Sequence, residues 1–192
     1  MYQTRESDAH IIFIAIGIMF ILSSIFLPMI VGPLLRESIY RPDRVILFSS
    51  GPDAYFVLIG AFLAIGAAAI VIGIQPLRRN IKACLSGLLI TAGLAGAVLA
   101  TDSYYYADQS GFHYNNLWSI KEKSISWDQI DSLVTVYEKE GVSLKPDRLE
   151  FHLHSSRQVD FPFYPSIENK IKEIESMILP YGGKLVIETT EQ

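Results

Sequence analysis

The sequence predicts an α-helical transmembrane region followed by a small α+β domain. Three uncharged apolar runs fill the first half of the chain, and a charged segment with period-two alternation follows them. Half of the 192 residues are hydrophobic, and the mean hydropathy is positive, +0.29. These observations indicate an integral membrane protein, with residues 1–101 forming the transmembrane region and residues 102–192 forming one small domain.

The three apolar runs cover about residues 11–35, 54–77 and 83–101. Because an α-helix rises 1.5 Å per residue, about 20 apolar residues cross the hydrocarbon core of a bilayer, so each run predicts a transmembrane helix. The first run is longer than the apolar part of a signal peptide and has no clear cleavage site, so it is expected to be retained. Its last turns contain Pro28, Gly32 and Pro33, which predict a bend there.

The second and third runs are separated by a short basic connection and predict an antiparallel helical hairpin. Small residues recur at every fourth position in both runs: Gly60, Ala64 and Ala68 in one, and Ala92, Gly96 and Ala100 in the other. This spacing lets two helix backbones approach closely, either within the hairpin, which is the simpler interpretation, or across a homo-oligomer interface. The interiors of the three runs carry no ionisable residue, which argues against an ion or proton pathway.

The connections between the runs bear on topology. Lys and Arg near the helix ends divide four against three between the two faces of the membrane. The compact connection around Arg78, Arg79 and Lys82 favours the N-terminus inside and the domain outside. The longer connection Glu37–Asp53 carries the apolar stretch Val45–Phe48, which is interpreted as an interfacial strand or flap, or as an ordinary loop.

The C-terminal domain is acidic. Residues 102–192 hold 9 Lys and Arg against 15 Asp and Glu. This balance repels phosphate backbones and anionic headgroups, so nucleic acid is not an expected partner and electrostatic binding to lipid is disfavoured. The single cysteine, Cys84, excludes an intramolecular disulfide and an all-cysteine metal site.

The domain is expected to be a sheet closed by one helix. After a turn at Asp108–Gly111, period-two patterns predict strands at residues 112–118, 124–127, 133–137, 149–154 and 159–163. Isoleucines at positions 167, 171, 174 and 178 then share one face of a helix that begins at Pro165 and ends before Gly182. Residues 184–188 predict one short edge strand.

Part of this pattern resembles a known family. The turn Asp108–Phe112, then Lys121-Glu122-Lys123 and the stretch Ile125–Ile130 with Trp127, resembles the bacterial pleckstrin-homology-like (PH-like) membrane proteins. The resemblance covers roughly residues 102–192 and implies a PH-like antiparallel β-sandwich or barrel closed by one C-terminal helix. It also implies a cytoplasmic binding or scaffolding domain, although such families usually carry a helical hairpin and not three helices. The turn lacks Lys and Arg, so headgroup binding is not carried over.

His152 and His154 are candidate metal ligands. They stand two apart on a predicted strand and are expected on one face, with Asp160 on the adjacent strand. Two histidines and a carboxylate can bind zinc. The simpler interpretation is a solvated sheet face, because Phe151 and Leu153 alternate with the histidines and point to the core. No other cofactor is expected.

Catalysis is not expected, because the sequence has no nucleophile elbow, Walker loop, dinucleotide turn or HExxH motif. Lys121 and Lys123 flank Glu122, so the positive charge there is expected to be nearly cancelled. The predicted function is a membrane-anchored module at the bilayer surface that binds a protein or peptide partner through an open sheet edge. The alternative is a regulatory subunit or oligomer of a small-molecule or ion-handling membrane protein.

Overall fold

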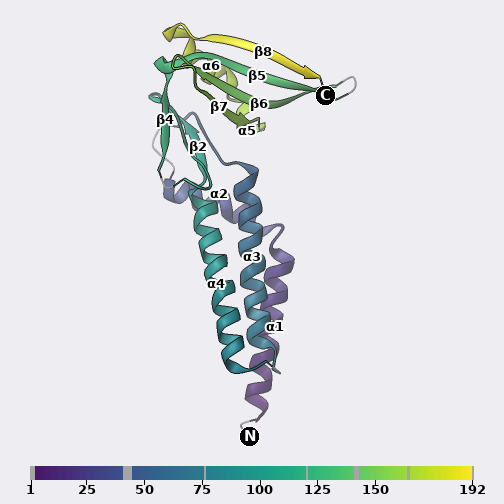
Figure 1. Ribbon diagram of the computed structural model, residues 1–192. Coiled ribbons are helices and arrows are strands. Elements are labelled where there is room, and N and C mark those ends of the chain that lie inside the picture. The colour runs from purple at the N-terminus through teal and green to yellow at the C-terminus, as the bar shows by residue number, and fades with distance from the viewer. Residues whose placement is uncertain are drawn as a thin grey trace. The chain divides into compact units, whose positions relative to one another are not determined.

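The computed structural model describes residues 3–40, 45–75, 77–119, 121–140, 143–163 and 165–191, and the chain divides into two compact units. The helical unit comprises Met1–Tyr40 and Gly51–Ser103, and the sheet unit comprises Arg41–Ser50 and Tyr104–Gln192 (Figure 1). The sheet unit therefore draws on two separate segments of the chain. One of them is the connection between the first two apolar runs.

The helical unit contains candidate membrane spans. Its helices are α1 (Gln3–Ser23), α2 (Leu27–Tyr40), α3 (Pro52–Gly73) and α4 (Arg79–Asp102). Helices α3 and α4 are each long and apolar enough to cross a membrane. The pair α1 and α2 passes the same test only as a whole, and it is bent by 80° at its break. The described residues thus provide two spans, or three if the bent pair is one span; Pro76 of the second predicted run lies outside them.

The first predicted helix is broken more sharply than a proline bend near its end would require. Helix α1 stops at Ser23, and Pro28 is the second residue of α2. The hydroxyl groups of Ser23 and Ser24 donate to the carbonyl oxygens of Phe20 and Ile21, at 3.2 and 2.7 Å. Serine hydroxyls that bind the preceding turn weaken a helix, and a proline fits well in the first turn of the next one, so the chain changes direction between Ser24 and Pro28. Pro33, by contrast, lies inside α2.

Glycines bring the helices close together. A Cβ atom at Gly17 of α1 would lie 2.6 Å from the carbonyl oxygen of Gly66 in α3, and one at Gly93 of α4 would lie 3.0 Å from that of Ala61. The predicted small-residue stripe is only partly in the interface: Ala100 is buried, but a Cβ at Gly60 would meet nothing within 4 Å. Small residues are so frequent in these helices that spacing alone did not identify the contacting face.

Arg36 of α2 is a buried cation that the sequence analysis missed, because the first apolar run was ended at Leu35. Only 5% of Arg36 is exposed. Its Nε and Nη2 donate to the carbonyl oxygen of Ala100, at 3.1 and 2.9 Å. Ala100 lies in the last turn of α4, where carbonyl groups lack helical partners and the helix dipole favours a cation. Arg36 therefore caps α4 inside the helical unit.

The sheet unit contains two four-stranded sheets, neither of which is closed in the described residues. The first sheet is antiparallel and has the order β1 (Leu47–Ser49), β2 (Tyr104–Ala107), β3 (Gly111–Asn115) and β4 (Lys123–Ser126). The second has the order β7 (Gln158–Pro162), β6 (Ser143–Leu153), β5 (Ile130–Glu140) and β8 (Lys184–Glu191). Strand β8 runs parallel to β5, and the other neighbours are antiparallel.

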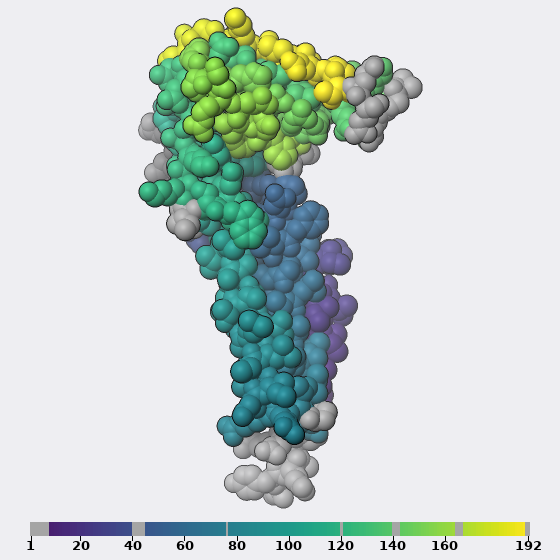
Figure 2. Space-filling view, in the orientation of Figure 1, coloured from purple at the N-terminus to yellow at the C-terminus, as the bar shows by residue number. Residues whose placement is uncertain are grey.

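Helices link and cover the strands of the sheet unit. The 3₁₀ helix η1 (Trp127–Gln129) joins the two sheets, and α5 (Pro165–Glu168), α6 (Ile171–Ile178) and η2 (Leu179–Tyr181) lie between β7 and β8 in the chain. The predicted single helix from Pro165 is thus two helices. In Figure 2 the yellow-green residues of this segment form one surface of the unit beside the yellow strand β8.

The segment Glu37–Asp53 differs from its sequence interpretation. Strand β1 pairs with β2, with Leu47 opposite Ala107 and Ser49 opposite Tyr105. Leu47 is 5% exposed and belongs to the core of the sheet unit. An apolar stretch of only four residues could not reveal that its pairing partner lies more than 50 positions later in the chain.

Aromatic side chains form the centre of the sheet unit's core. The ring of Phe112 lies 4.6 Å from that of Phe161 and 4.9 Å from that of Phe151, and Trp127 is 2% exposed. Of the four isoleucines on the predicted face of the closing helix, three are fully buried: Ile167, Ile174 and Ile178. The fourth, Ile171, is partly buried and packs against the same core. Both sheets and α6 therefore share one hydrophobic core.

Candidate functional site

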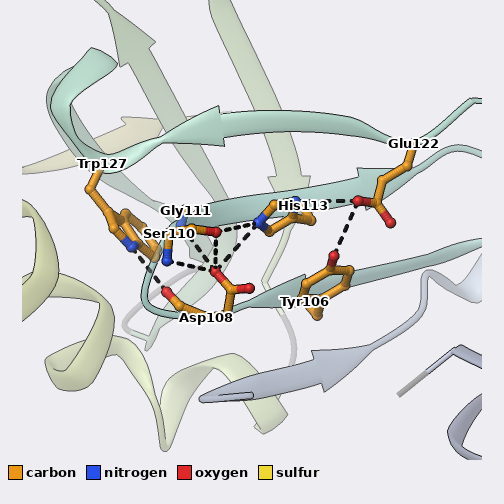
Figure 3. A network of polar contacts seen from close by, with 7 residues as sticks. All are labelled: Tyr106, Asp108, Ser110, Gly111, His113, Glu122 and Trp127. Carbon is orange, nitrogen blue, oxygen red and sulfur yellow. Dashed lines mark hydrogen bonds and ion pairs between the residues drawn. The ribbon is translucent and has the colours of Figure 1, made fainter. Parts of the chain in front are cut away.

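A polar network surrounds the β2–β3 hairpin (Figure 3). Its members are Tyr106, Asp108, Ser110, Gly111, His113, Glu122 and Trp127. The Oδ1 atom of Asp108 accepts bonds from the Ser110 hydroxyl (2.6 Å), the Ser110 amide (2.7 Å) and the Gly111 amide (3.1 Å). An aspartate followed by serine and glycine commonly closes a turn in this way, and the Nε1 of Trp127 donates to the Asp108 carbonyl oxygen at 3.0 Å.

His113 lies between two carboxylates. Its Nε2 is 3.4 Å from Oδ1 of Asp108, and its Nδ1 is 3.3 Å from Oε1 of Glu122, an ion-pair distance without the alignment of a hydrogen bond. The imidazole stacks on the ring of Tyr106, with 4.5 Å between ring centroids. The hydroxyls of Tyr104 and Tyr106 donate to Glu122, at 2.8 and 3.1 Å. The network thus links the hairpin to the β3–β4 connection.

The network shifts the pKa values of its members. Burial, followed by the charge and hydrogen bond of Glu122, raises the pKa of Tyr106 to about 12. Burial alone would raise the pKa of Asp108, but hydrogen bonds from Ser110 and Gly111 outweigh it, and the pKa lies below its usual value. Both shifts favour the protonation states that the network needs at neutral pH.

Ser110, His113 and Glu122 follow the order of a nucleophile, base and acid, with Ser110 Oγ 3.1 Å from His113 Nε2. The serine is nevertheless not activated. Its hydroxyl lies closer to Asp108, at 2.6 Å, and a proton donated there is not available to the imidazole. The arrangement is that of a hydrogen-bonded turn.

A second polar region is an open cleft of about 660 Å³ at the edges of the two sheets. Strand β4 lines it with Lys123 and Ile125, the β6–β7 turn with His154 and Arg157, and β7 with Val159. Strands β4 and β7 are each the last strand of a sheet in the described residues. The cleft is therefore bounded by two sheet edges, which are places where extended segments can add to a sheet.

The cleft has an apolar floor and a basic rim. Ile125 is 3% exposed, and Leu153 and Val159 are half-buried. The Nζ atom of Lys123 lies 5.9 Å from the centroid of the Tyr114 ring, which also lines the cleft. The cleft therefore combines an apolar floor with polar and charged side chains around it.

The β6–β7 turn presents the other basic side chains. The Ser156 amide donates to the Leu153 carbonyl oxygen, and the Leu153 amide donates to that of Arg157, both at 2.9 Å. Ser156 has a φ of 60°, in the left-handed region. These bonds hold a tight turn, which places His154 and Arg157 at the same cleft.

The structure does not bring the three candidate metal ligands together. His152 Nε2 lies 3.1 Å from Oε2 of Glu150, and His154 Nδ1 lies 3.6 Å from Oδ1 of Asp131. Asp160 accepts a bond from the Gln158 side chain at 2.8 Å. The reason is that β6 ends at Leu153, so His154 belongs to the turn. No group of three His, Cys, Asp or Glu residues suited to a metal occurs among the described residues, and the zinc site stays a prediction.

Glu150 is the centre of a separate polar cluster on β6. Its side chain is 8% exposed, and its carboxylate accepts bonds from Arg148 Nε, at 2.8 Å, and from His152. Burial alone would raise the pKa of Glu150, but these two partners lower it below its usual value. The charged groups of this cluster pair with one another, so His152 already has a partner, Glu150, without a metal.

The charge of Lys123 is not cancelled by its neighbour in the sequence. Glu122, which was expected to cancel its charge, is bonded to Tyr104 and Tyr106. Lys123, by contrast, lines the cleft beside Tyr114. The signal that could have found it is the period of two: neighbours in an extended chain point to opposite sides, so adjacent opposite charges need not meet.

The two candidate regions are the polar network, in which partners surround each charge, and the cleft, which is lined by cations and apolar side chains. Comparisons of the chain with protein-family models, with curated proteins and with solved structures found no match.

Proposed function

We propose that the chain is a membrane-anchored binding module whose sheet unit holds an extended segment of a protein partner in the cleft. The observation that carries the proposal is the place of the cleft, between the edge strands β4 and β7 and above an apolar floor. We propose binding without catalysis, because the one serine–histidine pair on the hairpin is a hydrogen-bonded turn.

The physical basis is strand addition. Edge strands have backbone donors and acceptors directed away from their own sheet, and an extended peptide can satisfy them. Side chains of the peptide would alternate between solvent and the floor formed by Ile125, Leu153 and Val159. Backbone bonds would supply affinity and the floor would supply selectivity.

The proposal includes the PH-like resemblance. Two sheets followed by a helix that packs its isoleucines on their core support it, since this is the order that the resemblance implies. Strand β1, from the connection between helices α2 and α3, is an addition to this pattern. Strand β8, which follows α6, corresponds to the edge strand predicted at residues 184–188.

The resemblance also implies a cytoplasmic sheet unit, whereas the distribution of Lys and Arg near the helix ends favours the outside. Labelling tests this: Cys84 is replaced by serine, and the exposed turn residue Gln109 by cysteine. With an impermeant maleimide, protection in intact cells and labelling after lysis are expected. Labelling in intact cells would place the unit and its partner outside, against the proposal.

Selection of binding peptides tests the proposed function. Phage-displayed random octapeptides are selected on the full chain in phosphatidylcholine nanodiscs. The variant Ser155→Trp fills the cleft from an exposed turn position, and Lys172→Trp places the same side chain on α6 as a matched control. Clones that bind the wild type and the control but lose at least about tenfold in affinity on Ser155→Trp, about 1.4 kcal/mol, would support the proposal. A selection without cleft-dependent clones would refute it.

A further inference from the structure

We infer that the segment bound in the cleft is acidic, and that one of its carboxylates is held by Lys123 and Arg157. This inference rests on the proposed function, since it names the chemistry of the peptide that the same cleft takes. It commits to a peptide carboxylate and not to a lipid headgroup.

The charge at the cleft is opposite to that of the domain. Residues 102–192 hold 15 acidic against 9 basic residues, yet the cleft is lined by Lys123 and Arg157 against the single carboxylate of Asp128. His154, which also lines the cleft, lies 3.6 Å from Asp131. In the described part of the chain, neither Lys123 nor Arg157 forms an ion pair. Arg148 and Lys170 of the same domain do have carboxylate partners. Two cations that lack one and line a single cleft therefore indicate an external anion.

Both cations act on one aromatic side chain, that of Tyr114. Lys123 Nζ lies 5.9 Å from the Tyr114 ring centroid. Burial raises the pKa of the Tyr114 hydroxyl, and the positive charge of Arg157 opposes this rise, which places that charge near the same residue. The two cations therefore approach the cleft around Tyr114 from different elements, Lys123 from β4 and Arg157 from the β6–β7 turn.

The side chains suit a carboxylate. An arginine guanidinium binds the two oxygens of a carboxylate in parallel, and a lysine ammonium adds a point charge with flexible reach. The apolar floor beneath them excludes water on one side, which strengthens such a pair relative to a fully solvated one.

A peptide fits these observations better than an anionic membrane surface does. An extended surface of negative lipids is repelled by the net negative charge of the whole domain. A single carboxylate in the cleft responds mainly to Lys123 and Arg157, because salt screens charges that lie beyond a Debye length of about 8 Å. The flanking edge strands offer backbone bonds that a peptide can use and a headgroup cannot.

The test uses the cleft-dependent octapeptides from the selection, synthesised with a fluorescein label and measured by anisotropy on the full chain in phosphatidylcholine nanodiscs. We expect them to contain Asp or Glu, and we expect amide replacement of that residue to weaken binding about tenfold. Lys123→Gln and Arg157→Gln should each lose a similar factor, whereas Lys172→Gln, an equal change of charge on α6, should lose none. Thermal unfolding of all three variants should match the wild type, which separates lost binding from lost folding.

A charge swap completes the test. Arg157→Glu should prefer a peptide in which Lys replaces the acidic residue. Cleft-dependent peptides without acidic residues, or equal binding of acid and amide forms, would overturn the inference while leaving the proposed function intact. Competition by phosphatidylserine vesicles but not by unlabelled peptide would overturn it in favour of a lipid. A selection that yields no cleft-dependent peptide contradicts the proposed function itself.

Discussion

The β2–β3 hairpin and the β6–β7 turn both combine serine and histidine with charged residues, but they differ in how those charges are satisfied. In the hairpin network, His113 lies between Asp108 and Glu122, and each of these carboxylates has further partners. At the cleft, Lys123 and Arg157 face open space without a carboxylate partner in the described residues.

This difference separates structural from functional polar groups. Removing a hydrogen-bond partner from a partly buried polar group leaves that group unsatisfied and lowers the free energy of unfolding. A charge without an internal partner in a cleft contributes little to folding and is available to a ligand. Variants of the network should therefore change stability without changing peptide binding, and variants of the cleft should do the reverse.

Gly111→Ala should break the network most severely. A Cβ atom at Gly111 would lie 2.3 Å from the carbonyl oxygen of Ile125, a backbone atom that cannot move without disturbing the β3–β4 pairing. We expect the free energy of unfolding to fall by about 3 kcal/mol. Chemical denaturation of the full chain measures it, with Gln109→Ala in the same turn as control. A loss below about 0.5 kcal/mol would show that the hairpin is not tightly held.

Asp108→Ala should cost about 2 kcal/mol, because three hydrogen bonds end on its Oδ1 atom. Peptide affinity should stay unchanged. The folded-state pKa of Asp108 is depressed, so its contribution to stability is present above the usual value and is lost as pH falls through the folded value. Between about pH 2 and 6, the free energy of unfolding should therefore depend less on pH in the variant than in the wild type, which denaturation at a series of pH values measures. An equal loss of stability at acid pH in the variant and the wild type would contradict this role of Asp108.

Tyr106→Phe should have a smaller effect, about 1 kcal/mol at neutral pH, since it removes one hydrogen bond to Glu122. The pKa of Tyr106 is raised from its ordinary value of 10.0 to about 12, so the folded state binds more protons between these values. The wild type should thus lose stability across this alkaline window, and the variant should lose less. Ultraviolet titration of the tyrosine hydroxyls checks this: the ionisation at the highest pH should be absent from the variant.

Ser156→Gly should have the smallest effect and the opposite sign. Ser156 adopts a φ of 60°, which glycine reaches without strain, so we expect about 0.5 kcal/mol of stabilisation. Thermal unfolding measures it, and Ser155→Gly in the same turn is the control. Destabilisation by Ser156→Gly would mean that its side chain has a role that its backbone conformation does not explain.

The sequence predicted those features that depend on local pattern. Two of the three apolar runs correspond to α3 and α4, and the isoleucines of α6 are buried as their spacing predicted. Strands β3 to β8 were each located by their alternation, but their ends were not predicted: β5 extends from Ile130 to Glu140, and β6 begins at Ser143 and not at Leu149.

Features that depend on distant pairing were not predictable from the sequence. Strand β1 reaches its partner across more than 50 residues, and Arg36 reaches Ala100 across 64. The cleft likewise combines β4 with the β6–β7 turn, so the proximity of Lys123 and Arg157 depends on how the two sheets pack. Local periodicity carries no information on such contacts.

Mapping the attachment point of a bound peptide tests the central claim most directly. A selected octapeptide carrying benzoylphenylalanine is irradiated on the full chain in nanodiscs, and the modified residues are identified by mass spectrometry. The account predicts attachment to β4 and to the β6–β7 turn, around Ser124 and Ser155, with loss of attachment in Arg157→Gln. Attachment to the Asp108–His113 hairpin or to β8 would contradict it.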